Sequence, residues 1–270
     1  MYKINFNNLY FIKETFSQIT NNISKENTSK ENTFKENMHN NPLEHFFFKK
    51  LRNNKYFNDI LNYKEKNILN LILETCIKHL NKQKIDYFFG FGSLIGTVRH
   101  GFRMPWDDDI DLIINRKDIF KLINNLIPID KQDKHTKYKL TDDIVIMYKN
   151  WGVPIKLYYK NSRYPFIDIY LYDSDGDYIN IEKKQLQHGH IKKFKELKND
   201  IFPLKTGKFE NFIVNIPKNY EKILKNQFGD NVLTTCVISW NHKENKKKHI
   251  SKEIQINHIH SKFLKPEIYD

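Results

Sequence analysis

The sequence is poor in cysteine, and its two cysteines, Cys76 and Cys236, lie far apart in the chain. Two isolated cysteines do not make a disulfide framework, and they lack the close spacing of a cysteine-based zinc site. Cys76 falls on the apolar side of a predicted helix, where a buried thiol belongs to the core. We therefore expect a reduced protein that is held together by packing and not by cross-links.

Long hydrophobic runs are also absent. A membrane-spanning helix needs about 18 or more consecutive apolar residues, and no such run occurs; nor does the opening Met1–Phe6 resemble a signal peptide. We therefore expect a cytoplasmic protein without a transmembrane segment. Hydrophobic residues still make up 39% of the chain and aromatic residues 14%, which is enough for one sizeable core or two small domains.

Acidic residues are outnumbered by basic ones, and the formal net charge is +13. Such a charge favours anionic partners: nucleic acid, nucleotide phosphates or a negative membrane surface. The chain is rich in Asn, Lys and Ile throughout, however, and lysines mostly lie solvated on protein surfaces. The charge alone therefore does not predict a specific nucleic-acid partner.

The first part of the chain differs in composition from the rest. Residues 21–41 repeat a Lys-Glu-Asn unit without apolar periodicity, and such a stretch buries too little surface to offset the entropy lost on ordering. We predict a flexible Asn-, Lys- and Glu-rich segment over 1–41 and a folded domain over 42–270. The Lys-rich stretch after His242 is predicted to be a solvated tail.

Apolar spacing indicates a mixture of helices and strands. Helices are predicted over 64–82, over 117–126 and from Pro217 to Gly229. Short apolar or alternating runs predict strands over 85–89, 109–114, 144–148, 155–159 and 166–171, and one more strand or a hairpin arm over 209–216. The order lacks the regular alternation of a doubly wound sheet, so the predicted fold class is α+β, with a small mixed sheet flanked by helices.

Closely spaced acids provide the first chemical signal. Because alternate side chains of a strand share a face, Asp107, Asp109 and Asp111 are predicted to point the same way. Carboxylates crowded on one face repel one another unless a cation neutralises them. Oxygen ligands of this kind suit Mg²⁺ or Mn²⁺. An acidic surface turn or an adventitious Ca²⁺ site is the structural alternative.

A Gly-Ser pair precedes these acids. Gly92 and Ser93 directly follow a predicted strand, and apolar residues at helical spacing come after them. Small residues there let backbone N–H groups and the serine hydroxyl approach a phosphate at a helix N-terminus. A Gly-Ser turn followed by an Asp-x-Asp strand is typical of the nucleotidyltransferase-type fold.

The whole segment from Gly92 to Asp111 resembles the signature of the LicD family, which includes bacterial phosphorylcholine transferases and fukutin-type ribitol-phosphate transferases. The resemblance rests on Gly-Ser-Leu-Ile-Gly, Arg-His-Gly and Pro-Trp-Asp-Asp-Asp-Ile-Asp. Phe166-Ile-Asp168 resembles the later acidic strand of the family. The similarity covers roughly residues 65 to 242.

The resemblance implies roles for individual residues. Asp109 and Asp111 match the metal-binding pair of the family, and Asp107 matches a further ligand or a group just outside the ligands. Asp168 matches a third carboxylate that completes the metal site or takes the proton from an acceptor hydroxyl. These assignments make Asp109, Asp111 and Asp168 the predicted catalytic residues.

The same resemblance implies substrate contacts. Gly92 and Ser93 match the phosphate-holding turn. Arg99, His100 and Arg103 lie where positive groups would contact a diphosphate, although His100 is equally compatible with a structural role. Trp106 either stacks on a base or packs beside the site, and packing is the favoured role. Some family members use later Cys or His residues for zinc; His242 has no matching cysteine cluster, so we predict no zinc.

The implied activity is Mg²⁺- or Mn²⁺-dependent transfer of a phospho-alcohol, such as phosphocholine or ribitol phosphate, from a CDP-linked donor to a sugar hydroxyl of a glycan. One alternative is a nucleotidyltransferase that uses an NTP on the same fold. The other is a non-catalytic RNA-binding module. Family members in eukaryotes often work in the secretory pathway, which is an alternative to the expected cytoplasmic location.

Overall fold

The fold is described from a computed structural model, which describes residues 60–104, 106–132, 134–149, 153–160, 162–186, 191, 193–243, 246–255 and 267–270. All of these belong to one compact unit, Tyr56–Asp270. The predicted flexible segment 1–41 and the predicted domain start at Pro42 lie outside the described residues. Among the described helices, none is both long and apolar enough to cross a membrane.

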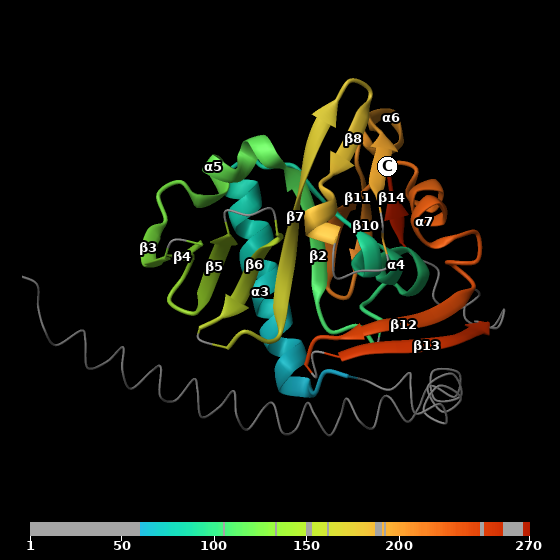
Figure 1. The fold of residues 1–270 in the computed structure, drawn as a ribbon, viewed down its shortest axis with the longest axis horizontal. Helices are drawn as coiled ribbons and strands as arrows, with labels where there is room; N and C mark the ends of the chain where they lie inside the picture. The colour runs from blue at the N-terminus through green and yellow to red at the C-terminus, as the bar shows by residue number, and fades with distance from the viewer. Residues whose placement is uncertain are drawn as a thin grey trace, which may run out of the picture. The chain divides into compact units, whose positions relative to one another are not determined.

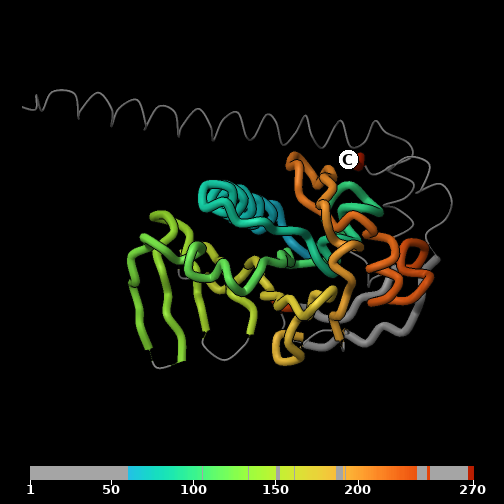
Figure 2. Tube along the Cα trace, turned by 90° about the horizontal axis from the view of Figure 1, so that it is seen from above, coloured from blue at the N-terminus to red at the C-terminus, as the bar shows by residue number. Residues whose placement is uncertain are grey.

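The first described element is the helix α3 (Tyr63–Lys82). It begins with a reciprocal cap, in which the Asn62 side chain accepts a hydrogen bond from the Glu65 N–H at 2.9 Å and the Glu65 carboxylate accepts one from the Asn62 N–H at 2.8 Å. Its apolar residues recur at helical spacing and are buried: Leu69, Ile72, Leu73, Cys76 and Leu80. This face packs against β6 and β7 of the main sheet, and Figures 1 and 2 show α3 lying along one side of that sheet.

The main sheet is mixed and has nine strands. Seven of them lie side by side in the order β1 (Tyr87–Phe89), β2 (Ile110–Asn115), β7 (Phe166–Asp175), β6 (Ile155–Tyr159), β5 (Ile144–Lys149), β4 (His135–Lys139) and β3 (Ile127–Gln132). The other two, β8 (Tyr178–Ile181) and β9 (Phe194–Leu197), branch from the far part of β7. Strands β2 and β7 run parallel, and the other pairs of this sheet are antiparallel.

The two faces of the sheet have different chemistry. Along β6 and β7, alternate side chains are fully buried on the face that α3 covers; these are Ile155, Leu157, Ile167 and Ile169. The residues between them, including Lys156 and Asp168, point to the opposite face. Both faces of the sheet bury hydrophobic residues, but the charged groups Lys156 and Asp168 lie on the face opposite α3, among apolar clusters that include Val145, Tyr158 and Phe166.

The helix α4 (Phe91–His100) follows β1 and packs against β2. It ends at Gly101, whose backbone is left-handed with φ 71°. Beside α4 lie a three-stranded sheet and the helix α7 (Tyr220–Phe228), and the strands of that sheet are β11 (Phe212–Ile216), β10 (Lys205–Phe209) and β14 (Ile268–Tyr269). The remaining elements are the short helical turns η1 (Arg116–Asp118), α5 (Ile119–Ile123), η2 (Lys183–Leu186) and α6 (Lys198–Ile201), and the ribbon of β12 (Thr235–Asn241) and β13 (Lys246–Gln255).

The mixed α/β class and the flanked mixed sheet are confirmed. The helices predicted over 64–82 and from Pro217 to Gly229 are α3 and α7, and the buried strands fall close to their predicted places. The segment 209–216, predicted as a strand or hairpin arm, is confirmed as the second arm of the β10–β11 hairpin. Two predictions need correction. The helix predicted over 117–126 is limited to the short turns η1 and α5 and ends at Ile123, and the end of the Lys-rich stretch predicted as a tail begins β13, which pairs with β12.

Candidate active site

Two neighbouring strands bring three buried carboxylates together. Asp111 on β2 and Asp168 on β7 are direct partners in the parallel register, so their side chains lie next to each other on one face. Asp109 lies just before β2. One ligand oxygen from each of Asp109, Asp111 and Asp168 lies within 4.8 Å of the others. We refer to these three residues as the acidic cluster; they are the predicted catalytic residues.

The Gly-Ser pair lies in the first turn of α4, beside the acidic cluster. The Ser93 hydroxyl oxygen accepts a hydrogen bond from the Asp111 backbone N–H at 2.9 Å, which ties α4 to β2. A Cβ atom on Gly92 would lie 2.6 Å from a carboxylate oxygen of Asp107. Any larger residue at position 92 would therefore displace the Asp107 carboxyl, which packs against the Gly92 backbone.

Asp107 occupies a different place from the predicted one. Strand β2 begins only at Ile110, so the predicted alternation does not extend back to Asp107. Among the described residues, the groups of mutually close ligand atoms include Asp109, Asp111 and Asp168 but not Asp107. Asp107 instead lies half-buried beside Gly92.

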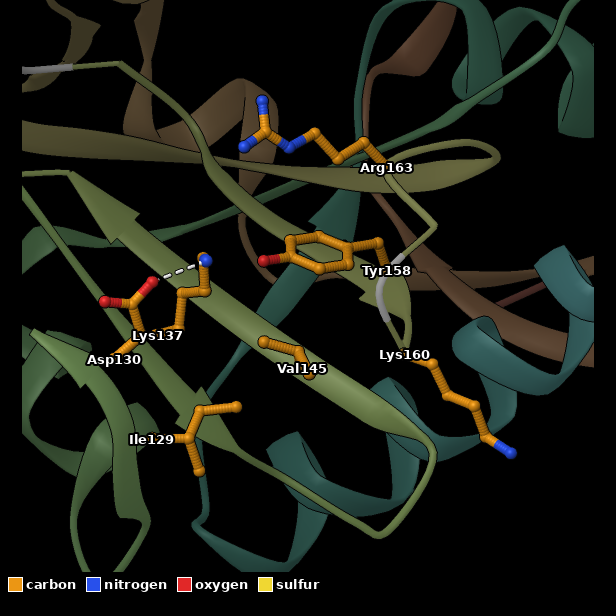
Figure 3. A pocket seen from close by; sticks show the side chains of 7 residues that line it. All are labelled: Ile129, Asp130, Lys137, Val145, Tyr158, Lys160 and Arg163. Atoms are coloured by element: carbon orange, nitrogen blue, oxygen red, sulfur yellow. Dashed lines mark hydrogen bonds and ion pairs between the residues drawn. The ribbon is translucent and has the colours of Figure 1, made fainter.

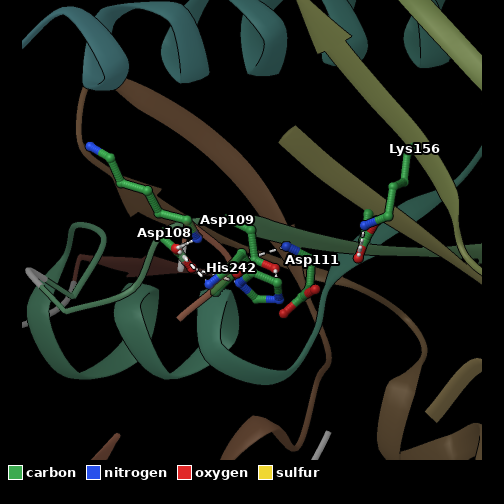
Figure 4. Close-up of polar contacts among 8 residues, drawn as sticks. Asp108, Asp109, Asp111, Lys156 and His242 are labelled. Carbon is green, nitrogen blue, oxygen red and sulfur yellow. Dashed lines mark hydrogen bonds and ion pairs between the residues drawn. The ribbon is translucent and has the colours of Figure 1, made fainter. Parts of the chain in front are cut away.

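Two cationic side chains flank the acidic cluster. Lys156 on β6 places its Nζ 2.6 Å and 2.9 Å from the two carboxylate oxygens of Asp168, and the same Nζ lies 3.5 Å from the centre of the Phe166 ring. The Nε2 of His242 lies 3.5 Å from an oxygen of Asp109. Figure 4 shows His242 beside Asp108 and Asp109, with Lys156 at the other end of the group.

Asp108 holds His242 in this position. Its side chain is 1% exposed, and it lies 2.6 Å from the His242 Nδ1 while accepting a hydrogen bond from the His242 backbone N–H at 3.0 Å. Burial alone would lower the pKa of His242, but the charges of Asp109 and Asp108 outweigh it and raise that pKa to about 9. His242 is therefore protonated at neutral pH and forms an ion pair with Asp108.

The charges of this region do not balance. Four buried aspartates, Asp108 and the acidic cluster, face two cations. Burial raises the pKa of Asp109 to about 6, with His242 opposing the shift and Asp108 and Asp168 adding to it. Burial and the neighbouring carboxylates also raise the pKa of Asp111 and of Asp107 well above the usual range. A divalent cation would restore the balance, and an all-oxygen ligand set suits Mg²⁺ or Mn²⁺.

The ligand atoms of Asp108, Asp109 and His242 also lie close to one another and share Asp109 with the acidic cluster. Because His242 is protonated at neutral pH and bonded to Asp108, this second group is an ion pair that borders the acidic cluster. The absence of a zinc site stays a prediction.

Arg99 and His100 are engaged inside the protein. The Arg99 guanidinium donates hydrogen bonds to the backbone carbonyls of Val232 at 2.9 Å and Thr235 at 2.7 Å, and to the ring of His100 at 2.9 Å. Both side chains are buried. In this structure Arg99 anchors the segment that follows α7, so a contact with a diphosphate would require these bonds to be exchanged.

Arg103 and Trp106 are likewise packed into the fold. Arg103 forms an ion pair with Glu210 at 2.6 Å and is almost fully buried. Trp106 is 4% exposed and meets the ring of His100 edge-on. The structure therefore favours the packing role of Trp106, and the substrate contacts of Arg103 stay a prediction.

Sequence reasoning missed Lys156 and the role of His242. A single Lys within the apolar run Ile155-Lys-Leu-Tyr is a signal for a charged group on the open face of a strand. His242 lies 134 positions after Asp108 in the sequence, yet its ring contacts the Asp108 carboxylate. No local pattern reveals a contact over that separation.

Comparison with known proteins adds a family match. The model of the family described as LicD/FKTN/FKRP, nucleotidyltransferase domain, matches residues 84–219. The chain is similar to lipopolysaccharide cholinephosphotransferase LicD of Haemophilus influenzae, with 30% identity over 116 residues, which is 40% of this chain and 41% of that protein. It is also similar to ribitol 5-phosphate transferase FKRP of Homo sapiens, with 26% identity over 152 residues, which is 55% of this chain and 28% of that protein.

The chain thus spans less than half the length of these relatives. The residues that match the family model include the acidic cluster and Lys156, whereas His242 lies beyond them.

Proposed function

The chain belongs to the LicD/FKTN/FKRP nucleotidyltransferase family, and we propose that it is a metal-dependent phosphotransferase. It moves a phospho-alcohol, such as phosphocholine or ribitol phosphate, from a CDP-linked donor to a sugar hydroxyl of a glycan. The observation that carries the proposal is the acidic cluster, whose ligand oxygens lie within 4.8 Å of one another and are buried. The names of the relatives, a cholinephosphotransferase and a ribitol 5-phosphate transferase, support the class of reaction.

Asp109, Asp111 and Asp168 would hold Mg²⁺ or Mn²⁺. The under-compensated negative charge and the oxygen-only ligand set support this assignment. When bound, the ion supplies positive charge that offsets the charge of the transferring phosphate.

The proposed reaction exchanges one phosphorus–oxygen bond for another. The acceptor hydroxyl oxygen bonds to the phosphorus of the phospho-alcohol, the bond from that phosphorus to CMP breaks, and CMP leaves with the bonding electrons. Asp168 accepts the proton of the hydroxyl. Of the three carboxylates in the cluster, Asp168 is the one on the strand that pairs with β6. Lys156 orients Asp168 through both of its oxygens.

The first turn of α4 is the proposed binding place for the donor phosphates. Backbone N–H groups at a helix N-terminus favour anions, and a donor phosphate would bind there beside the Asp107 carboxyl, which packs against Gly92. Ser93 fixes the turn beside Asp111 through its hydrogen bond. Gly92 and Ser93 thereby place the donor next to the acidic cluster.

A nucleotide-product assay tests the proposal. The purified chain is mixed with CDP-choline, CDP-ribitol or CDP-glycerol, with and without Mg²⁺ or Mn²⁺, and CMP release is measured. We expect metal-dependent release that Asp109→Asn abolishes. The matched control is Asp142→Asn, because the Asp142 side chain is 91% exposed and pairs with Lys139; this variant should keep wild-type release.

Diphosphate release from an NTP, without CMP release from any CDP-alcohol, would replace the proposal with the nucleotidyltransferase alternative. CMP release that survives Asp109→Asn would show that the acidic cluster does not carry the reaction.

A further inference from the structure

A row of residues on neighbouring strands leads away from the acidic cluster along the open face of the main sheet. Strand pairing places Asp168 opposite Lys156, then Met147 on β5, Lys137 on β4 and Asp130 on β3. Directly paired residues share one face of a sheet. With neighbouring strands about 4.8 Å apart, Lys137 lies about 14 Å from Asp168.

A cavity of about 360 Å³ lies at the far end of this row. It is lined by Ile129, Asp130, Lys137, Val145, Tyr158, Lys160 and Arg163. Val145 and Tyr158 are buried members of an apolar group that continues to Phe166, next to the acidic cluster. Figure 3 shows the Tyr158 ring in the middle of the cavity wall, with its hydroxyl directed toward the Lys137–Asp130 pair.

The cavity carries excess positive charge. Lys137 is paired with Asp130 at 2.6 Å, and Lys160 is paired with Asp143 at 2.9 Å. In the part of the chain that the structure describes, no acidic side chain forms an ion pair with Arg163. The guanidinium of Arg163 is exposed at the cavity and is the cation that a ligand would neutralise.

These groups suit a sugar with a negative charge. The ring of Tyr158 and the side chain of Val145 offer an apolar surface to a sugar ring, and the Asp130–Lys137 pair offers an acceptor and donors to its hydroxyl groups. Arg163 would bind a phosphate or carboxylate substituent through charge-assisted hydrogen bonds.

We propose that this cavity is the acceptor subsite and that it takes a sugar unit with an anionic substituent, a phosphate or a carboxylate. The inference rests on the proposed function and deepens it by naming the acceptor class. The donor is proposed to bind at α4, which packs against β2, whereas the cavity lies on β3 to β6. In-line transfer requires the attacking and leaving oxygens on opposite sides of the phosphorus, and α4 and the cavity lie toward opposite ends of the sheet relative to β7, which carries Asp168.

The separation also fits a chain-like acceptor. The cavity is too far from Asp168 for one sugar ring to fill it and present its hydroxyl to the acidic cluster at the same time. A short oligosaccharide that follows the row of paired residues would place its anionic unit in the cavity and its terminal hydroxyl beside Asp168.

The test measures binding to the full chain without donor or metal, by ligand-observed NMR titration. The probes are glucose 6-phosphate, glucuronic acid, glucose and inorganic phosphate. The variant Arg163→Gln removes the exposed charge. The matched control is Lys195→Gln, since Lys195 lies 4.4 Å from the centre of the Tyr178 ring and does not line the cavity.

We expect both anionic sugars to bind about tenfold more tightly than glucose, because a hydrogen bond to a charged group adds about that much affinity. Both should also bind more tightly than inorganic phosphate. Arg163→Gln should remove this preference, and Lys195→Gln should keep it. Equal affinities for glucose and glucose 6-phosphate, or unchanged binding by Arg163→Gln, would overturn the subsite. Inorganic phosphate that binds as tightly as glucose 6-phosphate would overturn the sugar part.

The CMP-release assay separates this inference from the proposed function. CMP release without selective binding of anionic sugars overturns the subsite alone. Selective binding through Arg163 without release of CMP or transfer from any CDP-alcohol overturns the transferase, and with it the acceptor role of the cavity.

Discussion

The row of paired residues that crosses the main sheet has aspartates at both ends, and the pKa values of two of them, Asp109 and Asp130, are shifted in opposite directions. Asp109, in the acidic cluster at one end, is buried among other carboxylates, and its pKa is raised to about 6. Asp130 at the other end keeps 30% of its side chain exposed, and the hydrogen bond from Lys137 lowers its pKa. Burial and like charges thus keep the acidic cluster poised for a cation, whereas an aspartate with its own lysine at the surface needs none.

The largest expected effect comes from removing one charge of the acidic cluster. Asp109→Asn should lower CMP release by at least about 10³-fold, because it deletes a proposed metal ligand worth several kcal/mol to the transition state. The same change should stabilise the metal-free protein by about 1–3 kcal/mol at pH 7.5, since it removes a carboxylate with a raised pKa. Turnover and urea denaturation in EDTA measure the two effects.

The matching change at the other end, Asp130→Asn, should leave Mn²⁺ affinity within about twofold of wild type, because Asp130 lies outside the acidic cluster. If Asp109→Asn instead destabilised the metal-free protein, the contrast between the two aspartates would be wrong.

The next effect is the pH dependence of metal binding. Because the metal-free pKa of Asp109 is about 6, a cation must displace its proton below that pH, and Mn²⁺ affinity should weaken about tenfold per pH unit for each displaced proton. Calorimetric titration from pH 5 to pH 8 measures this. An affinity that does not change between pH 5 and pH 7 would contradict the raised pKa.

The raised pKa of Asp109 also determines whether the stability of the metal-free protein rises or falls with pH. A carboxyl whose folded-state pKa lies above its unfolded value binds more protons in the folded state, so the metal-free protein loses stability as pH rises from about 4 to 6. Mn²⁺ should therefore raise Tm more at pH 7.5 than at pH 5.5. For Asp130 the lowered pKa gives the opposite sign, and its small contribution is lost as pH falls through that pKa.

The smallest expected effect is a change in Mn²⁺ affinity, which should distinguish the two lysines of the row, Lys156 and Lys137. Lys156→Met should tighten Mn²⁺ binding several-fold, because Lys156 occupies both oxygens of Asp168 and repels a cation. It should also cost the metal-free protein about 1 kcal/mol, a value reduced by the 30% exposure of the Lys156 side chain. Lys137→Met is the control, and its Mn²⁺ affinity should equal that of wild type. Equal affinities for the two variants would place Lys156 outside the metal site.

Longer strands and helices with a buried face were predictable from the sequence, whereas exposed strands and the short strands β8 and β9, which bury only alternate residues, were not. The helix α3 and the strands β5, β6 and β7 show clear apolar periodicity. Strands β3 and β4 are largely exposed and carry charged side chains, such as Asp130 and Lys137, so their apolar pattern is weak. The pairing of β3 with β4 and of β4 with β5 depends on backbone hydrogen bonds that no local sequence pattern predicts.

The acids of the candidate site were predictable from their motifs, but their partners were not. Asp111 and Asp168 become neighbours only through the parallel pairing of β2 with β7. Lys156 enters through the antiparallel pairing of β6, and His242 through the chain after α7. Conversely, Arg99 and Arg103 carry the charge that a phosphate site needs, yet the structure commits them to Val232 and Glu210.

The adjacency of β2 and β7 separates the proposed reaction centre from the proposed acceptor subsite along the chain. After Asn115 the chain forms η1, α5 and the strands β3 to β6 of the same sheet before it returns at Phe166 beside β2, and this intervening segment carries most of the residues that line the cavity. Because Asp111 and Asp168 are held together by the β2–β7 pairing itself, we expect that a graft in place of β3 to β5 would change the cavity and keep the two carboxylates side by side.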